Sequence, residues 1–258
     1  MRCSAERKKT SQLTFWGKAA YYGNKVLSLL TILIMVIGGA YCVYCLYDDW
    51  RQAQGGLPSE MAKYKPDADD PKSFDELLRI NPDVIGWITI DDTHIDQPVV
   101  QGEDDMEYIN KGADGSHTLA GAIFLAAINK PDFSDPYNIL YGHHMDNHGM
   151  FGDVMEFVNK SYFDSHKTGS LLTKDFKEYE LDTFAVVETN SADNHLYSLS
   201  EIEDGKTTEL ISYLKENARY FREPEADSPK VFALSTCNDA MSEGRTILYC
   251  YARKVVEH

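Results

Sequence analysis

Residues 231–250 read VFALSTCNDAMSEGRTILYC and predict two neighbouring strands with a thiol at the turn between them. Val231–Thr236 is an apolar run that turns polar at its end, and Thr246–Val255 is a second run rich in aliphatic and aromatic residues. The connection between them is short, so we expect the two strands to lie side by side. Cys237 then ends the first strand, and Arg245 opens the second.

The rest of the chain beyond residue 72 carries more strand signals than helix signals. Five further runs predict strands: Val84–Ile90, Ile95–Gln101, Ala122–Ala127, Asn138–Tyr141 and Glu180–Glu188. Ser73 and Glu76 form a capping-box pattern, which predicts a short helix ending near Ile80. Apolar spacing predicts two more helices, at Met150–Val158 and at residues 206–220. Many strands with few helices indicate a mainly β domain that closes, or nearly closes, into a barrel.

One apolar segment near the N-terminus predicts a membrane span. Val26–Tyr47 contains 22 residues without a charge, and as a helix it would cover about 33 Å. Asp48 and Asp49 follow it. The basic residues of this region all precede it: Arg2, Arg7, Lys8, Lys9, Lys18 and Lys25. This asymmetry predicts a single-pass protein of the cell membrane with a cytoplasmic N-terminus and an extracellular main domain.

The chain therefore divides into four predicted parts. Residues 1–25 form a basic cytoplasmic segment, 26–47 a transmembrane anchor, 48–72 a stalk rich in Gly and Pro, and 73–258 the extracellular domain. A cleaved signal peptide is the alternative, but the apolar run is long for one and ends without a small-residue cleavage site.

Composition narrows the class of protein. The chain has 43% hydrophobic and 26% charged residues, which is typical of a folded globular protein. Its formal net charge of −16 argues against a nucleic-acid partner, because such proteins present a basic face. A solvated acidic exterior accounts for this charge.

Cys237 is the candidate nucleophile. A thiol at the end of a strand is held by a rigid element and still reaches solvent. A free cysteine is often only a small buried apolar residue, but the nearby Arg245 favours a catalytic role for Cys237. The Arg245 guanidinium would favour a thiolate or donate hydrogen bonds to an oxyanion. The alternative is a surface arginine at a strand edge, which is common.

The run Tyr141-Gly142-His143-His144-Met145 supplies candidate acid–base groups at the end of another predicted strand. An imidazole there can give a proton to a leaving amine and take one from an incoming amine. A pair of solvated loop histidines is the alternative. His144, His148 and Asp146 also suggest a metal site, but no third firm ligand accompanies the two histidines. We therefore predict no metal.

A disulfide between Cys237 and Cys250 would remove the nucleophile. Arg245 and Cys250 differ by five positions, so on a regular strand they point to opposite faces. If Arg245 shares a face with Cys237, then Cys250 faces away and packs as a small apolar residue.

Taken together, these segments resemble the sortase family of cysteine transpeptidases. The family carries a Cys at a TLxTC-like strand end, a His in a Gly-His motif before it and an Arg shortly after it. The matching segments here are Leu234-Ser235-Thr236-Cys237, Tyr141-Gly142-His143 and Gly244-Arg245-Thr246. The segments at 81–88, 95–101 and 121–125, with Met150-Phe151, look most like class B.

The resemblance implies an eight-stranded sortase-type β-barrel with a few peripheral helices. It also implies that Cys237 is the nucleophile, His143 the general acid/base and Arg245 the oxyanion-stabilising group, with Ser235 and Thr236 binding substrate. The substrate would be a surface protein or pilin with a C-terminal sorting signal, cleaved after Thr. The acceptor would be a peptidoglycan cross-bridge amine or a pilin lysine, and no cofactor is implied.

Two other functions fit parts of the sequence. A thiol peptidase would release the same intermediate to water, but papain-like enzymes place Cys before His, and their signature is absent. A catalytically silent surface-binding barrel would need no thiol at all.

Overall fold

The computed structural model describes residues 14–54, 61–70, 73–190, 193, 207–225, 229–237 and 244–257. The chain forms two compact units, Met1–Arg51 and Gln52–His258. We describe each unit by itself.

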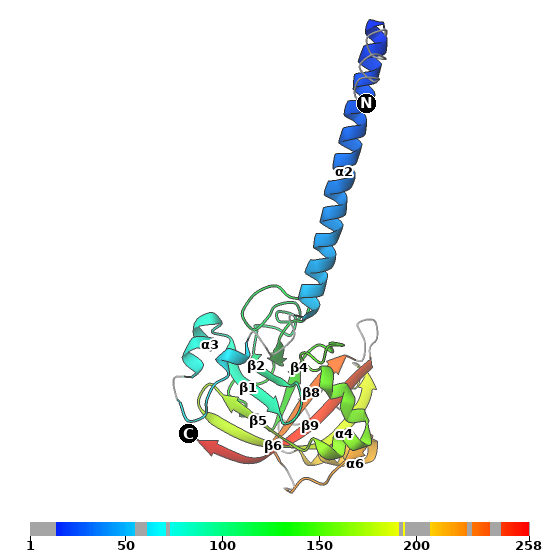
Figure 1. Cartoon of the computed structure of the whole chain (residues 1–258). Helices are drawn as coiled ribbons and strands as arrows, with labels where there is room; N and C mark the ends of the chain where they lie inside the picture. The colour runs from blue at the N-terminus through cyan, green and yellow to red at the C-terminus, as the bar shows by residue number, and fades with distance from the viewer. Residues whose placement is uncertain are drawn as a thin grey trace. The chain divides into compact units, whose positions relative to one another are not determined.

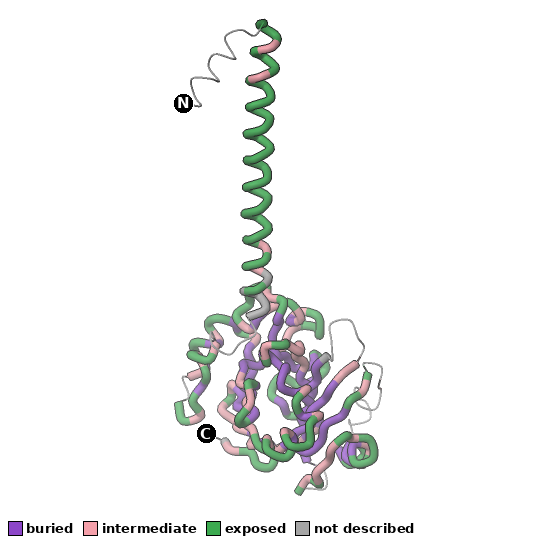
Figure 2. Tube along the Cα trace, turned by 45° about the vertical axis from the view of Figure 1, so that its right-hand side comes forward, coloured by how far each residue is buried: buried purple, intermediate pink, exposed green. Residues whose placement is uncertain are grey.

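The first unit is built on one helix, α2 (Phe15–Gln54), which is long and apolar enough to cross a membrane. Its described side chains are almost all exposed, large apolar ones included (Figure 2). The predicted span at 26–47 lies inside this helix. The helix also continues through residues 48–54, which the sequence assigned to the stalk.

The second unit is a closed barrel of eight strands (Figure 1). The strands are β1 (Val84–Ile90), β2 (Asp96–Val100), β3 (Ile123–Leu125), β4 (Tyr137–Tyr141), β5 (Thr168–Thr173), β6 (Lys177–Asn190), β8 (Val231–Cys237) and β9 (Gly244–Glu257). They are hydrogen-bonded in the order β5-β1-β2-β3-β4-β8-β9-β6, and a β5–β6 pairing closes the ring. The predicted eight-stranded barrel is confirmed. Its strand β5 was not predicted, because Thr-Gly-Ser opens it with polar residues.

Strand β6 is long enough to serve three neighbours. Its first half pairs with β5, its second half pairs with the two-residue β7 (Tyr220–Phe221), and β9 runs along its whole length. The β6–β9 ladder therefore extends as far as Gly244 and Arg245, and Arg245 is the partner of Cys237 on β8.

The barrel has an apolar interior and two covered outer faces. Phe232, Leu248 and other buried residues fill the interior. Helix α6 (Thr208–Asn217) packs Leu210, Ile211 and Leu214 over the outer faces of β4, β8, β9 and β6 (Figure 1). Helix α3 (Phe74–Ile80) covers β1 and its neighbours in the same way, through Phe74 and Leu77.

The segment before α3 packs on the barrel, although the sequence placed it in the stalk. It contains the 3-10 turn η1 (Ala62–Tyr64), and Lys65 Nζ lies 2.7 Å from Asp96 Oδ1. Burial alone would raise the pKa of Asp96, but hydrogen bonds from Lys65, Trp87 and Thr89 hold it below its usual range. This partly buried acceptor ties the segment to β1 and β2.

The predicted capping box at α3 is wrong. Ser73 has helical backbone angles, and its side chain makes no cap bond. The Ser73 hydroxyl donates instead to Asp67 O at 2.9 Å. The bond to the preceding segment therefore takes the place of a bond between the Ser73 side chain and the first turn of α3.

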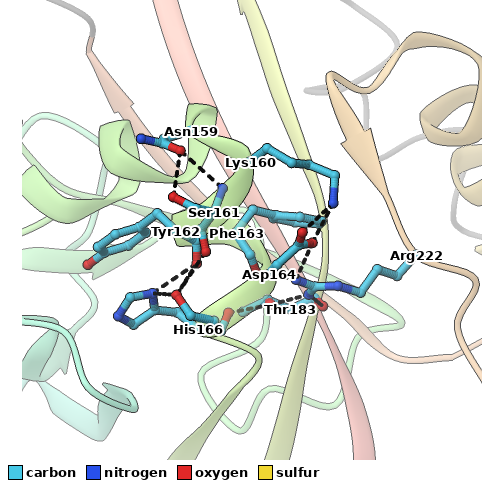
Figure 3. Close-up of polar contacts among 10 residues, drawn as sticks. Asn159, Lys160, Ser161, Tyr162, Phe163, Asp164, His166, Thr183 and Arg222 are labelled. Carbon is cyan, nitrogen blue, oxygen red and sulfur yellow. Dashed lines mark hydrogen bonds and ion pairs between the residues drawn. The ribbon is translucent and has the colours of Figure 1, made fainter.

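The predicted helix at Met150–Val158 is a 3-10 helix, η2 (Gly152–Val158), that begins two residues later. Met150 adopts a left-handed φ of 50°, which excludes it from a helix. A further short helix, α4 (Lys160–Ser165), follows at once. The Asn159 carboxamide caps it by accepting from the Ser161 amide, as Figure 3 shows.

Arg222 links β7, β6 and α4 (Figure 3). Its Nη1 donates to Thr183 O at 2.7 Å and to Thr183 Oγ1 at 2.9 Å, and its Nη2 donates to Phe163 O. The guanidinium also lies 3.8 Å from the centre of the Phe163 ring. One side chain therefore satisfies acceptors from two elements and covers an aromatic face.

We expect Arg222→Ala to lower the free energy of unfolding by about 2–3 kcal/mol, because it leaves half-buried carbonyls without a donor. This corresponds to a fall of roughly 5–10 °C in Tm for a domain of this size. Thermal unfolding of the purified full chain in detergent measures it. Arg219→Ala is the control, because Arg219 pairs with Glu188 on the exposed surface and should matter little. Equal Tm values for the two variants would contradict the structural role of Arg222.

Candidate active site

Three neighbouring strands bring the backbones of the predicted catalytic residues together. Strand β4 runs parallel to β8 with Tyr141 beside Ser235, and the Gly142 amide extends this ladder by donating to Ser235 O at 3.2 Å. His143 and Cys237 follow Tyr141 and Ser235 by two residues each. On the other side of β8, Cys237 is the direct partner of Arg245 in the antiparallel ladder with β9.

Cys237 lies on β8, the middle strand of the three. Adjacent strands lie about 4.8 Å apart, so the Cα atoms of Cys237 and Arg245 are separated by roughly one strand spacing. Residues directly opposite in an antiparallel pair project to the same face, which favours a thiol and a guanidinium side by side. The placement of Cys237 rests on its backbone, because its side chain is outside the described part.

The imidazole of His143 is fixed by the long loop between β2 and β3. Its Nε2 lies 2.8 Å from Ile109 O, and a carbonyl oxygen can only accept. Nε2 therefore carries the proton, and Nδ1 is the ring nitrogen left for proton transfer.

A buried tyrosine holds this loop in place. The hydroxyl of Tyr108, next to Ile109, donates to Asp83 Oδ2 at 2.6 Å and accepts from Asn81 Nδ2 at 2.9 Å. Burial of the ring, with the adjacent Asp83 carboxylate, raises the pKa of Tyr108 above its ordinary value, so the hydroxyl stays a donor. Sequence reasoning missed this support, because it joins residues far apart in the chain and carries no motif.

Gly142 is required by the packing of Phe151. A Cβ atom on Gly142 would lie 2.7 Å from Phe151 Cδ2, closer than carbon atoms approach in folded proteins. The Phe151 amide also donates to His143 O at 3.0 Å. Phe151 thus contacts Gly142 and His143 and closes the loop that begins at the Gly-His dipeptide.

The remaining predicted site residues lie along the same strand ends. The side chain of Arg245 is partly exposed, and its Nη1 donates to its neighbour Gly244 O at 2.9 Å. Ser235 and Thr236 are only 2% and 1% exposed. Their assignment to substrate binding stays a prediction, and their burial favours a role in packing the strand end.

Cys250 lies too far along the sheet to form a bridge with Cys237. It pairs with Phe232, five residues before Cys237 on β8, which is a separation of about 16 Å at 3.3 Å per residue. A disulfide needs Cα atoms within about 7 Å. Cys250 is a free thiol buried in the barrel interior, and this burial raises its pKa. The prediction that Cys250 packs as a small apolar residue is confirmed.

The metal set considered from the sequence does not converge. His144 Nε2 lies 3.6 Å from the exposed Asp146, while His148 turns to a different carboxylate, that of Asp153, at 2.6 Å.

Comparison with known proteins supplies relatives in both sequence and structure. No family model matches the chain. The sortase B of Listeria monocytogenes is 29% identical over 226 residues, which cover 83% of this chain and 89% of the relative. A class B sortase of Streptococcus pyogenes, described as involved in pilus biogenesis, is 38% identical with a TM-score of 0.63 over 69% of this chain and 96% of that structure. The sortase B of Bacillus anthracis is 26% identical with a TM-score of 0.67, over 82% of this chain and 100% of that structure.

The closed barrel and these similarities define the class of protein as a cysteine transpeptidase. More narrowly, the chain belongs to the sortase family and is class B-like. The family resemblance seen in the sequence is therefore confirmed.

Because Cys250 is a buried free thiol, we expect Cys250→Ala to leave the catalytic rate essentially unchanged. Its effect should be a small core truncation that lowers the free energy of unfolding by about 1–2 kcal/mol. Thiol counting with an aromatic disulfide reagent, on native and denatured protein, with and without reductant, tests the assignment. Thiols that react only after reduction would show a bridge and contradict the register argument.

Proposed function

We propose that this sortase is a membrane-anchored transpeptidase that uses Cys237 to cleave a C-terminal sorting signal after Thr. The acyl group then passes to an amine of the cell wall or to a pilin lysine. The observation that supports this proposal is the pairing of β8 with both β4 and β9, which places Cys237 opposite Arg245 and places Ser235 beside Tyr141, two residues before His143.

In the first step Cys237 gives its thiol proton to His143 Nδ1, and the thiolate sulfur attacks the carbonyl carbon of the Thr residue to form a tetrahedral oxyanion. Arg245 donates hydrogen bonds to that oxygen, which stabilises the developing charge. The C–N bond then breaks, and His143 gives a proton from Nδ1 to the leaving amine. A thioacyl-enzyme remains.

In the second step an incoming amine attacks the thioester, and His143 takes its proton back. The C–S bond breaks, the Cys237 thiolate is restored and a new amide forms. Water in place of the amine would give hydrolysis. The loop contact from Ile109 O supports this assignment of roles, because it leaves Nδ1 as the ring nitrogen for proton transfer.

The location follows from α2 and from the charges around it. We infer that residues 26–47 cross the membrane, with 1–25 in the cytoplasm and the catalytic domain at 73–258 outside. The basic residues before the span and the acidic pair after it support this orientation. A pilin lysine is a credible acceptor because the Streptococcus pyogenes relative is described as involved in pilus biogenesis.

The decisive experiment incubates the purified full chain in detergent with peptides that carry candidate sorting signals, with and without a small amine acceptor. Intact-protein mass spectrometry should show a thioacyl adduct on Cys237, and the amine should convert it to an amide product. Cys237→Ala should form neither adduct nor product while keeping its Tm. Cleavage by the Cys237→Ala protein would overturn the mechanism, and adducts that only water resolves would make the enzyme a peptidase.

We expect His143→Ala to lower kcat/KM by at least about a hundredfold, whereas His144→Ala should cost far less. The two residues are adjacent, but only His143 has a ring nitrogen fixed by the β2–β3 loop. Steady-state kinetics with one peptide compares them, and circular dichroism checks that both variants fold. Equal losses would show that no single imidazole carries the proton.

A further inference from the structure

A second cluster of polar side chains lies outside the three strand ends. His94 lies in the turn between β1 and β2, His148 lies in the loop after β4, and Asp153 lies in the first turn of η2. These three segments are separate in the chain, so the cluster exists only in the folded barrel.

The carboxylate of Asp153 is the buried centre of this cluster. Its Oδ2 accepts from the His94 amide at 2.7 Å and lies 2.9 Å from His94 Nδ1. Its Oδ1 lies 2.6 Å from His148 Nδ1. Burial alone would raise the pKa of Asp153, but the hydrogen bonds from His94 and His148 hold it below its usual range, so the group is an anion.

The two imidazoles converge on this anion from the solvent side. Their rings are stacked with centres 5.2 Å apart and planes 25° from parallel. The His94 and His148 side chains are 59% and 48% exposed, while that of Asp153 is 2% exposed. A buried carboxylate therefore lies beneath two exposed imidazoles.

The geometry is close to that of a metal site. One ligand atom from each residue lies within 4.8 Å of the other two. Imidazole nitrogens and carboxylate oxygens bind Zn²⁺ at about 2.0–2.2 Å, which in a tetrahedral site sets neighbouring ligand atoms roughly 3.4 Å apart. The contacts of 2.6 and 2.9 Å would lengthen by roughly half an ångström or more to admit an ion, a change within reach of exposed histidine side chains.

We propose that His94, His148 and Asp153 form a binding site for one divalent transition-metal ion of the Zn²⁺ class. Borderline metal ions of this kind prefer imidazole ligands, and two histidines with one carboxylate leave a further position for water. On binding, each Nδ1 gives up to solvent the proton that it donates to Asp153 and bonds to the ion instead, while Nε2 carries the proton of the neutral imidazole. This site is additional to the transpeptidase centre, for which we proposed no metal.

Metal binding would tie the loop after β4 to the β1–β2 turn. His148 lies five residues after His143 in that loop, and its amide donates to Met145 O at 3.0 Å. The ion should therefore stabilise the folded domain, since a ligand that binds only the folded state raises Tm.

The test uses the full chain in detergent without a histidine tag, in a Cys237→Ala background so that the strand-end thiol cannot bind metal. Isothermal titration with Zn²⁺ and visible absorption of Co²⁺ measure affinity and stoichiometry. We expect one ion per chain and a rise in Tm with Zn²⁺. His148→Ala and Asp153→Asn should each weaken binding by at least about tenfold.

The matched control is His117→Ala, which removes an exposed histidine of the β2–β3 loop and should leave binding unchanged. If Asp153→Asn does not fold, the exposed His94→Ala carries the same test, because its side chain contributes little to the core. A specific site should bind Zn²⁺ with a Kd below ~10⁻⁴ M. If no binding is detected at ~100 µM Zn²⁺, the proposal is overturned. Binding that survives unchanged in both His94→Ala and His148→Ala would overturn it as well.

Discussion

The hydrogen-bond register of β8 between β4 and β9 is the constraint on which the candidate site depends. It fixes Cys237 opposite Arg245 on one side and Ser235 beside Tyr141 on the other. A slip of one residue would send the side chains of the slipped strand to the opposite face of the sheet. The buried pattern along β8 prevents such a slip, because Phe232 and Leu234 fill the barrel interior while Ala233 packs beneath α6.

Closure of the barrel makes that register rigid. The pairing of β5 with β6 leaves none of the eight ring strands as an open edge, and the long β6–β9 ladder carries the constraint to the strand end. Helices α3 and α6 then cover the outer faces on opposite sides. The reacting groups can therefore lie at the tips of strands, next to loops, while their backbones stay fixed.

Loops complete what the strands begin. The β2–β3 loop brings the Ile109 carbonyl to His143 and thereby sets which ring nitrogen is free, and buried Tyr108 holds that loop to the turn before β1. The loop after β4 closes on itself through Phe151 and Gly142 and then carries His148 to Asp153. One loop thus serves both the candidate active site and the proposed metal site.

Much of the chain could be predicted from local pattern. The alternation and composition of Val84–Ile90 and Val231–Thr236 predict their strands closely, and the uncharged run at 26–47 predicts a helix of membrane length. These features are local, because β-branched and apolar runs favour the same conformation in most surroundings. Weakly apolar β5 and the left-handed turn at Met150 were missed, since pairing partners and loop closure override propensity there.

By itself, the sequence determined the kinds of group available and the order of the strands that carry them, through residue chemistry and short-range periodicity. Cys237 at a strand end and an imidazole in a Gly-His pair could be recognised in this way. Only the tertiary structure decided which of these groups meet. Tyr141 pairs with Ser235 across a parallel ladder, Cys237 pairs with Arg245 across an antiparallel one, and His94 reaches Asp153 across 59 positions of chain. Such contacts depend on the closed barrel, because long-range pairing and burial leave no local trace in the residues that they join.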